Sequence, residues 1–266
     1  MRSRSFTFTH AVTRRPCAAI VDGLRAVDTG APDLSTFQQH HSDYVAALKS
    51  TGAQVTELGE LDAFPDSVFV EDTALCLQEA AILMRPGAPS RLGEAEKMRP
   101  VLEDLYGSVL TIKGPGTIEG GDVLVTETEI LVGRSERTDS EGIRELEELV
   151  KPLEYRVREV YTPPDVLHFK TDCSLLDDNT ILSTRRLAAS GCFENYDVIE
   201  TVEGEEACAN SIRFNDIVLF PAGFPETRAK LKSSGFKVVE IGNSEAAKLD
   251  GGMSCLSLRS SPVGKA

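Results

Sequence analysis

One short pattern recurs along the chain: a polar residue, an apolar run, a polar turn and a second apolar run. It occupies residues 72–85, 122–134 and 172–185, with a looser copy at 210–220, so that successive copies begin 50, 50 and 38 residues apart. Two apolar runs around a polar turn predict a β-hairpin. Hairpins at such separations indicate a repeat architecture.

Helical patterns and one further strand separate the hairpins. Apolar residues recur three and four positions apart in 94–106 and 139–149, which predicts helices. Apolar runs follow at 109–112, 155–160 and 237–241, each leading towards the next hairpin.

The N-terminal part has the same order, with a helical pattern at 36–48 and a strand-like run at 54–58. Both chain ends are strand-like as well, at 6–12 and 253–258. We expect them to complete a fifth unit together. The predicted fold is therefore α/β, with about five βαβ-type units around a central axis.

The composition indicates a globular protein. With 41% hydrophobic residues over 266 positions, the chain can bury a large core. We expect one domain over 1–266, with short flexible ends at 1–5 and 260–266. No stretch approaches 18 apolar residues and no signal-peptide pattern is present, so we expect a cytoplasmic protein without membrane association. The net charge of −14 argues against nucleic-acid binding.

The six cysteines are scattered, without a Cys-x-x-Cys pair or a histidine at zinc-finger spacing. We therefore expect neither a disulfide framework nor a metal site, and no cofactor.

The segments that lead into the hairpins, here called the entrances, carry reactive side chains. Glu71 and Asp72 form a carboxylate pair at the first, Glu119 precedes two glycines at the second, and His168 lies at the third. Cys255 follows a pair of glycines at the last. Singly, each has an ordinary structural explanation as a turn cap, a hydrogen-bonded histidine, a bulge or a core thiol. Their equivalent positions in the repeat favour a shared site.

A thiol, a histidine and a carboxylate support nucleophilic catalysis by a thiolate. The further carboxylates are unusual for such a site, because negative charge raises the pKa of a neighbouring thiol. A cationic substrate resolves this conflict. A planar guanidinium pairs with carboxylates in bidentate fashion, and its charge favours the thiolate once it is bound.

At these residues the chain resembles the dimethylarginine dimethylaminohydrolase family of the guanidino-group-modifying (pentein) superfamily. The resemblance covers about 8–258, and its most specific motif is 65–72. Glu119, His168 and Cys255 lie in motifs shared more widely across the superfamily. The resemblance implies a five-bladed α/β propeller of pseudo-fivefold ββαβ-type repeats.

The resemblance also implies a reaction. Cys255 would attack the guanidinium carbon and form a covalent S-alkylthiouronium, while His168 protonates the departing amine. His168 would then deprotonate water, which releases citrulline, and Glu119 would orient His168. Methylated arginines are the implied substrates. The enzyme is expected to act on small cationic guanidino amino acids, as a monomer or a homodimer.

Further residues match the family's substrate-binding positions. Glu71 and Asp72 would clamp the guanidinium. At the amino-acid end, Arg91 and Arg137 would hold the α-carboxylate and Asp66 the α-amino group. The resemblance also implies backbone contacts to the substrate, made by Leu24 in a lid and by Leu249 before the catalytic turn.

Three positions depart from the patterns of related enzymes. Asp139 replaces the family's usual Asn and either adds negative charge near the carboxylate site or caps the following helix. Leu256 replaces the second cysteine of vertebrate relatives, so zinc inhibition through such a pair is not expected. Lys170 stands where arginine and agmatine deiminases have an Asp that clamps unsubstituted nitrogens, which suits a methylated guanidine.

Two alternatives stay open at this point. The protein could be a related hydrolase of arginine or citrulline, which product identification would distinguish. It could instead be a non-catalytic propeller that serves as a binding protein, in which case Cys255 would be unreactive at neutral pH.

Overall fold

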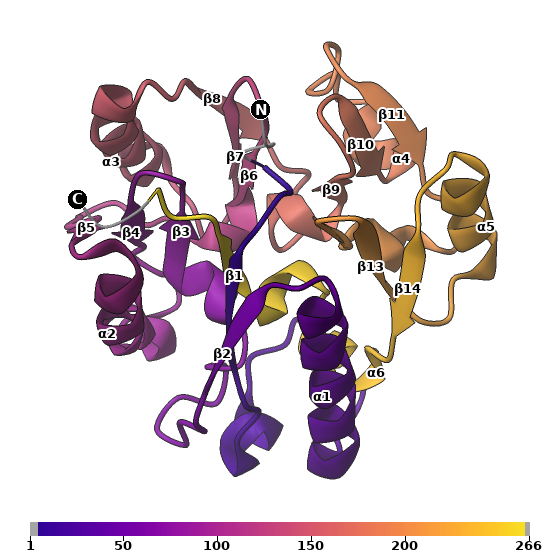
Figure 1. The fold of residues 1–266 in the computed structure, drawn as a ribbon, viewed down its shortest axis with the longest axis horizontal. Helices are drawn as coiled ribbons and strands as arrows, with labels where there is room; N and C mark the ends of the chain where they lie inside the picture. Colours follow the sequence, from indigo (N-terminus) through magenta and orange to yellow (C-terminus); the bar gives the residue numbers. More distant parts are fainter. Residues whose placement is uncertain (1–4, 264–266) are drawn as a thin grey trace.

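The computed structural model describes residues 5–263, which form five three-stranded sheets arranged in a ring around a central axis (Figure 1). The sheets, called blades below, have the strand orders β15-β1-β2, β3-β4-β5, β6-β7-β8, β9-β10-β11 and β12-β13-β14. The strands are β1 (His10–Arg14), β2 (Gln54–Leu58), β3 (Ala74–Cys76), β4 (Ala81–Leu83), β5 (Val109–Thr111), β6 (Val123–Val125), β7 (Ile130–Arg134), β8 (Val157–Tyr161), β9 (Cys173–Leu175), β10 (Thr180–Ser183), β11 (Asp197–Glu200), β12 (Ile212–Phe214), β13 (Ile217–Pro221), β14 (Val238–Ile241) and β15 (Leu258–Ser260).

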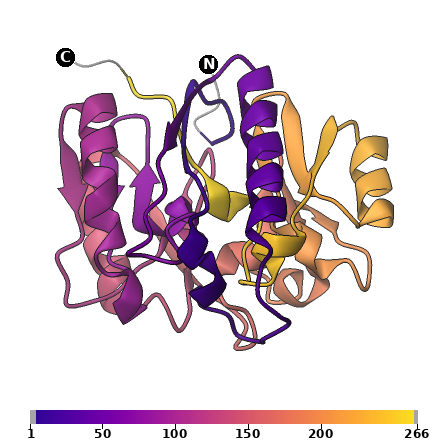
Figure 2. The ribbon, with the colours of Figure 1, turned by 90° about the horizontal axis from the view of Figure 1, so that it is seen from below.

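Each blade repeats one topology. Its middle strand pairs antiparallel with the first strand and parallel with the third. The parallel pair needs a crossover connection, and in four blades a helix of nine residues or more supplies it. The helices are α1 (Leu34–Ser50), α2 (Glu94–Tyr106), α3 (Ser140–Val150), α4 (Arg185–Ala188), α5 (Pro225–Ser233) and α6 (Ser244–Ala247). Seen edge-on, α1, α2 and α5 stand on the outside of the ring (Figure 2). The predicted α/β propeller of five hairpin-based units is confirmed; its treatment as a single domain stays a prediction.

The two ends of the chain close the ring. β15 pairs antiparallel with β1, with Leu258 opposite Val12. The expected fifth unit is therefore present, but its strands begin later than predicted. The backbone N–H and C=O of Phe8 bind the side chain of Asn215 instead of a neighbouring strand. The expected flexible ends at 1–5 and 260–266 lie partly outside the described residues; of the described ones, Ser260 is buried and belongs to β15.

A short 3₁₀ turn precedes the first strand of each blade. These turns are η2 (Val70–Thr73), η4 (Gly120–Asp122), η6 (Phe169–Thr171), η7 (Glu206–Ala209) and η8 (Ser254–Leu256). Consecutive turns touch from η8 through η2, η4 and η6 to η7. The predicted continuation of a strand through 253–256 is therefore wrong, because these residues form the turn that carries Cys255.

Polar side chains at the entrances fasten one turn to the next. Asp72 Oδ1 accepts a hydrogen bond from Gly121 N at 3.0 Å, and Asp122 Oδ1 accepts one from Phe169 N at 2.8 Å. Asn210 Oδ1 accepts one from Ser254 N at 2.9 Å. These are three of the four polar residues that open the repeated pattern. Their recurrence therefore reflects the need to satisfy backbone N–H groups buried around the axis.

Five apolar clusters fill the space around and between the blades. The cluster on the inner side of α1 includes Phe37, Tyr44 and Leu48 and extends to Cys255 and Leu256. Within residues 5–263, no helix combines the length and the apolar character that crossing a membrane requires.

Tyr44 couples α1 to the turn that carries Cys255. Its fully buried hydroxyl lies 2.9 Å from the carbonyl oxygen of Met253 and 2.7 Å from Ser257 Oγ. We expect Tyr44→Phe to lower the free energy of unfolding by about 1–2 kcal/mol, because buried acceptors lose their partner. The same change at the exposed Tyr161 is the control in urea denaturation. Equal stability of the two variants would contradict this role for Tyr44.

Candidate active site

The η4 and η6 turns bring Glu119 and His168 into direct contact. His168 Nε2 lies 2.6 Å from Glu119 Oε2, and both side chains are buried. Burial alone would lower the pKa of His168, but the neighbouring Asp72, Asp122 and Glu119 outweigh it and raise this pKa to about 9. Burial opposes ionisation of Glu119 as well, yet the hydrogen bond and charge of His168 lower its pKa. The pair is therefore an imidazolium with a carboxylate at neutral pH.

The carboxylate also fixes the orientation of the imidazole. The other oxygen of Glu119, Oε1, accepts a hydrogen bond from Gly87 N at 2.8 Å and lies 3.6 Å from an Arg137 nitrogen. Gly121 lies against the imidazole, and a Cβ there would come within 2.7 Å of His168 Nδ1. Glu119 therefore fixes the imidazole ring through Nε2, while Nδ1 lies against Gly121.

The charge of Asp72 acts on both the histidine and the thiol. Asp72 Oδ1 is 4.0 Å from His168 Nε2, and this negative charge raises the pKa values of both His168 and Cys255. Arg91 Nη1 donates to Asp72 Oδ2 at 2.6 Å and fixes this carboxylate from behind. Asp72 is thus placed to receive a cation beside the thiol.

Asp72, Glu119 and His168 are also the one group in the described chain whose donor atoms lie close enough together, within 4.8 Å, to hold a metal ion. Each donor already has a protein partner. Arg91 and Gly121 bind Asp72, and Glu119 binds the protonated His168. The chemistry of this cluster is therefore that of proton transfer and cation binding.

Cys255 lies in η8 with its side chain 7% exposed. Burial, followed by the charges of Glu71 and Asp72, raises the pKa of its thiol to about 12. Two donors face the sulfur: Gly252 N at 3.4 Å and Asn210 Nδ2 at 3.8 Å. The Cys255 thiol is therefore neutral at neutral pH, as expected beside carboxylates.

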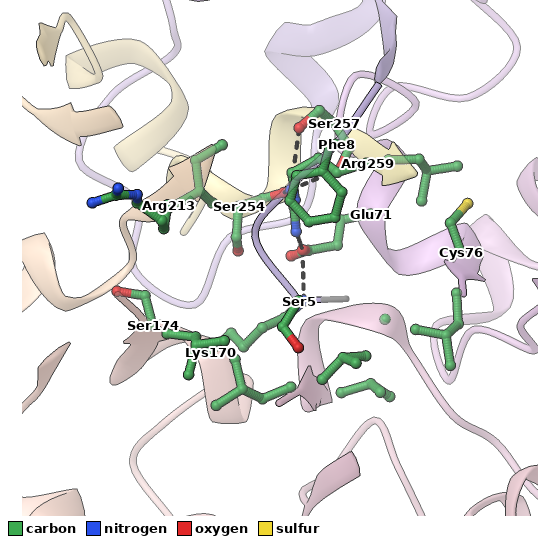
Figure 3. A pocket seen from close by; sticks show the side chains of 18 of the residues that line it. Ser5, Phe8, Glu71, Cys76, Lys170, Ser174, Arg213, Ser254, Ser257 and Arg259 are labelled. Atoms are coloured by element: carbon green, nitrogen blue, oxygen red, sulfur yellow. Dashed lines mark hydrogen bonds and ion pairs between the residues drawn. The ribbon is translucent and has the colours of Figure 1, made fainter. Parts of the chain in front are cut away.

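Glu71 is oriented differently from its neighbour Asp72. Its Oε1 lies 2.5 Å from both Lys170 Nζ and an Arg259 nitrogen. Burial alone would raise the pKa of Glu71, but these two cations lower it. Figure 3 shows Glu71 between Lys170 and Arg259 in the pocket on the axis of the ring, which Ser5 and Phe8 also line. Consecutive residues of a 3₁₀ turn point about 120° apart, so two adjacent carboxylates face different groups.

The predicted role of Glu71 as a guanidinium clamp stays a prediction. Its Oε1 is paired with two buried cations, whereas its buried Oε2 has no hydrogen-bond partner in the described residues. Asp72 is likewise paired with one buried cation, Arg91. Lys170, expected to mark the absence of a further carboxylate clamp, is one of the partners of Glu71.

The predicted lid, which contains Leu24, contacts the residues that precede the turn with Cys255. Leu24 N donates to Asp66 Oδ1 at 3.0 Å, and a Cβ on Gly23 would come within 3.1 Å of Leu249. Ala26 N donates to Asp250 Oδ2 at 2.6 Å. Leu24, Asp66 and Leu249 thus form one group, although they lie far apart in the sequence.

The two predicted carboxylate-binding arginines differ in exposure. Arg91 is buried and donates to Asp72, Glu94 and the carbonyl oxygen of Phe69. The side chain of Arg137 is 22% exposed, lies 3.6 Å from Glu119 Oε1 and also acts by its charge on Asp66. Asp139, the departure from the family pattern, caps α3 by accepting a hydrogen bond from Gly142 N at 2.8 Å.

Sequence reasoning missed Asn210 and Arg259 as members of the site. Asn210 did carry a signal, because it opens the fourth copy of the repeat. Arg259 carried none, since nothing in its local sequence pairs it with Glu71, 188 positions away.

Known proteins are similar to this chain in fold and in sequence. Residues 60–261 match the family model described as arginine deiminase. Two curated relatives are N(G),N(G)-dimethylarginine dimethylaminohydrolases. The one from Pseudomonas aeruginosa is 38% identical over 95% of this chain and 99% of the relative, and that from Streptomyces coelicolor is 32% identical over 94% and 96%. This chain belongs to the dimethylarginine dimethylaminohydrolase family. A solved structure of the Pseudomonas aeruginosa enzyme, a mutant complexed with citrulline, covers 96% of this chain and 100% of its own, with a TM-score of 0.93.

Replacing Glu71 tests the buried charge cluster. We expect Glu71→Gln to lower the free energy of unfolding by about 3–5 kcal/mol, because Lys170 and Arg259 would be left buried without their counter-charge. The variant should also react faster at Cys255 with a neutral alkylating agent, since one of the charges that raise its pKa is gone.

The control is Glu57→Gln, which breaks a more exposed pair with Arg15 and should cost about 1 kcal/mol or less. Urea unfolding of both variants provides the comparison. If Glu71→Gln were no less stable than Glu57→Gln, the cluster would not support the ring.

Proposed function

We propose that this protein hydrolyses Nω-methyl- and Nω,Nω-dimethyl-L-arginine to L-citrulline and methylamine or dimethylamine. The observation that carries this proposal is that the buried neutral thiol of Cys255, the protonated His168 and the carboxylate of Glu119 lie at turns around the axis of the propeller. Such a thiol would become a nucleophile when a bound cation lowers its pKa. Membership of the family, and a relative whose structure contains citrulline, support the same substrate class.

The first half of the reaction forms a covalent intermediate. A bound guanidinium beside Asp72 lowers the pKa of Cys255, and the thiol loses its proton to solvent. The thiolate attacks the guanidinium carbon, while His168 donates its proton to the methylated nitrogen as the C–N bond breaks. The amine departs, and an S-alkylthiouronium stays on Cys255.

The second half hydrolyses that intermediate. His168, now neutral, takes a proton from water, and the hydroxide adds to the thiouronium carbon. The C–S bond then breaks and the hydroxyl proton of the adduct is transferred to the departing sulfur, which restores the Cys255 thiol and leaves the ureido group of citrulline. Glu119 stabilises His168 in its charged form at both ends of this cycle.

The amino-acid end of the substrate has a separate set of partners. We propose that Arg137 and the second Nη1 hydrogen of Arg91 receive the α-carboxylate, and that Asp66 receives the α-amino group. Burial raises the pKa of Asp66, and a cationic ligand would oppose this. Leu24 and Leu249 supply backbone contacts. We also propose a cytoplasmic location and a monomeric or homodimeric state.

Specificity for a methylated guanidine follows from the guanidinium site. We propose that Glu71 and Asp72 clamp the guanidinium, and that Lys170, which is paired with Glu71, leaves no further carboxylate for the methylated nitrogen. A dimethylated nitrogen has no hydrogen to give to a further carboxylate, so its absence costs this substrate nothing.

A substrate panel with product identification tests this function. We expect dimethylamine from Nω,Nω-dimethylarginine, methylamine from Nω-methylarginine and at least about tenfold lower kcat/KM for ammonia release from arginine. Cys255→Ser should abolish turnover. The matched control is Cys208→Ser, since Cys208 is a buried thiol in an apolar cluster that does not include Cys255. Ammonia from arginine as the main product would favour the arginine-hydrolase alternative, and full activity of Cys255→Ser would exclude a thiol mechanism.

A further inference from the structure

Asn210 makes three contacts with the turn that carries Cys255. Its side-chain Oδ1 accepts a hydrogen bond from Ser254 N at 2.9 Å, and its backbone carbonyl oxygen accepts one from Met253 N at 3.2 Å. Its side-chain Nδ2 lies 3.8 Å from Cys255 Sγ. Asn210 is 5% exposed. A Cβ on Gly252 would come within 2.2 Å of the Asn210 amide carbon, so this glycine is what allows the amide to lie against the turn.

One part of this arrangement is general to the ring. Asp72 and Asp122 fasten the next entrance in the same way that Asn210 fastens η8, through a side-chain oxygen that accepts from a backbone N–H. A carboxylate performs this task at two of the three positions. Fastening the ring therefore does not explain why the residue that binds η8 is an asparagine and not an aspartate.

The difference between Asn and Asp matters at this position because of the charges around the sulfur. An amide adds a donor, whereas a carboxylate would add another negative charge next to a thiol whose pKa negative charge already raises. The ionisable groups that act on Cys255 or are acted on by it are Glu71, Asp72, Lys170, Arg259 and Tyr44.

We propose that Asn210 is a hydrogen-bond donor to the reacting sulfur, and that its Nδ2–H stabilises the thiolate while its Oδ1 fastens η8. The proposal rests on the proposed function only in treating Cys255 as the nucleophile. It assigns a side chain from the fifth blade to the site, so that all five blades contribute. Cys255 comes from the first blade, Asp72 from the second, Glu119 from the third, His168 from the fourth and Asn210 from the fifth.

Asn210→Asp separates the two roles, since it keeps the accepting oxygen and removes the donor. We expect it to fold with a melting temperature within about 3 °C of the parent protein, because Asp72 and Asp122 show that a carboxylate can fasten a turn. Its Cys255 should react with chloroacetamide at least about tenfold more slowly at pH 8, through loss of the donor and addition of charge. Asn210→Ala removes the donor without adding charge and should also slow alkylation, with a larger loss of melting temperature.

Asn215→Asp is the matched control. Asn215 also accepts through Oδ1 and donates through Nδ2, but its partners are the backbone of Phe8 and Thr51 Oγ1. This variant should leave the alkylation of Cys255 unchanged. If the dependence of alkylation on pH were the same in the parent, Asn210→Asp and Asn210→Ala, Asn210 would only fasten the ring and the proposal would fail.

The alkylation assay reports on the thiol without any turnover. A failure of the parent protein to hydrolyse methylarginines would therefore overturn the proposed function and leave the result for Asn210 standing. A reduced rate of alkylation with normal methylarginine turnover would overturn the role of Asn210 in stabilising the reacting thiolate.

Discussion

The buried contact of Glu71 with Lys170 and Arg259 joins the electrostatics of the site to the closure of the ring. Lys170 comes from η6 and Arg259 from β15, so one carboxylate links three blades at the axis. The charge of Glu71 also raises the pKa of Cys255. The same carboxylate therefore joins the blades and adds to the effect of burial, which keeps the Cys255 thiol protonated.

The ring explains how residues from distant parts of the chain form one site. Each blade presents a short turn to the axis, and polar side chains fasten one turn to the next. The pairing of β1 with β15 closes the ring, and η8, which carries Cys255, contacts η2, which carries Glu71 and Asp72. Chemistry then depends on which polar side chain each turn carries, while the hairpins behind the turns supply a rigid frame.

The sequence predicted most of this arrangement because its repeat is local. Alternating apolar runs and turns determine each hairpin, and the residues before each hairpin were correctly grouped at one axis. The orientation of neighbouring side chains was not predictable in this way. Glu71 and Asp72 are adjacent, yet they face different groups. The partners of Glu71 lie 99 and 188 positions away in the sequence, so a local pattern could not identify them. Asn210 was overlooked because an amide at an entrance has an ordinary structural role.

The central claim is that the Cys255 thiol is neutral in the free protein and ionises only when a cation binds. Inactivation by chloroacetamidine and by its neutral isostere chloroacetamide at pH 7.5, each normalised to its rate with a free thiol, tests this most directly. We predict that the cationic reagent reacts at least about a hundredfold faster, and that the rate with the neutral reagent keeps rising beyond pH 9, since the folded-state pKa lies well above that range. Equal normalised rates, or a plateau for the neutral reagent near pH 7–8, would show a thiolate already present without substrate and would contradict the account.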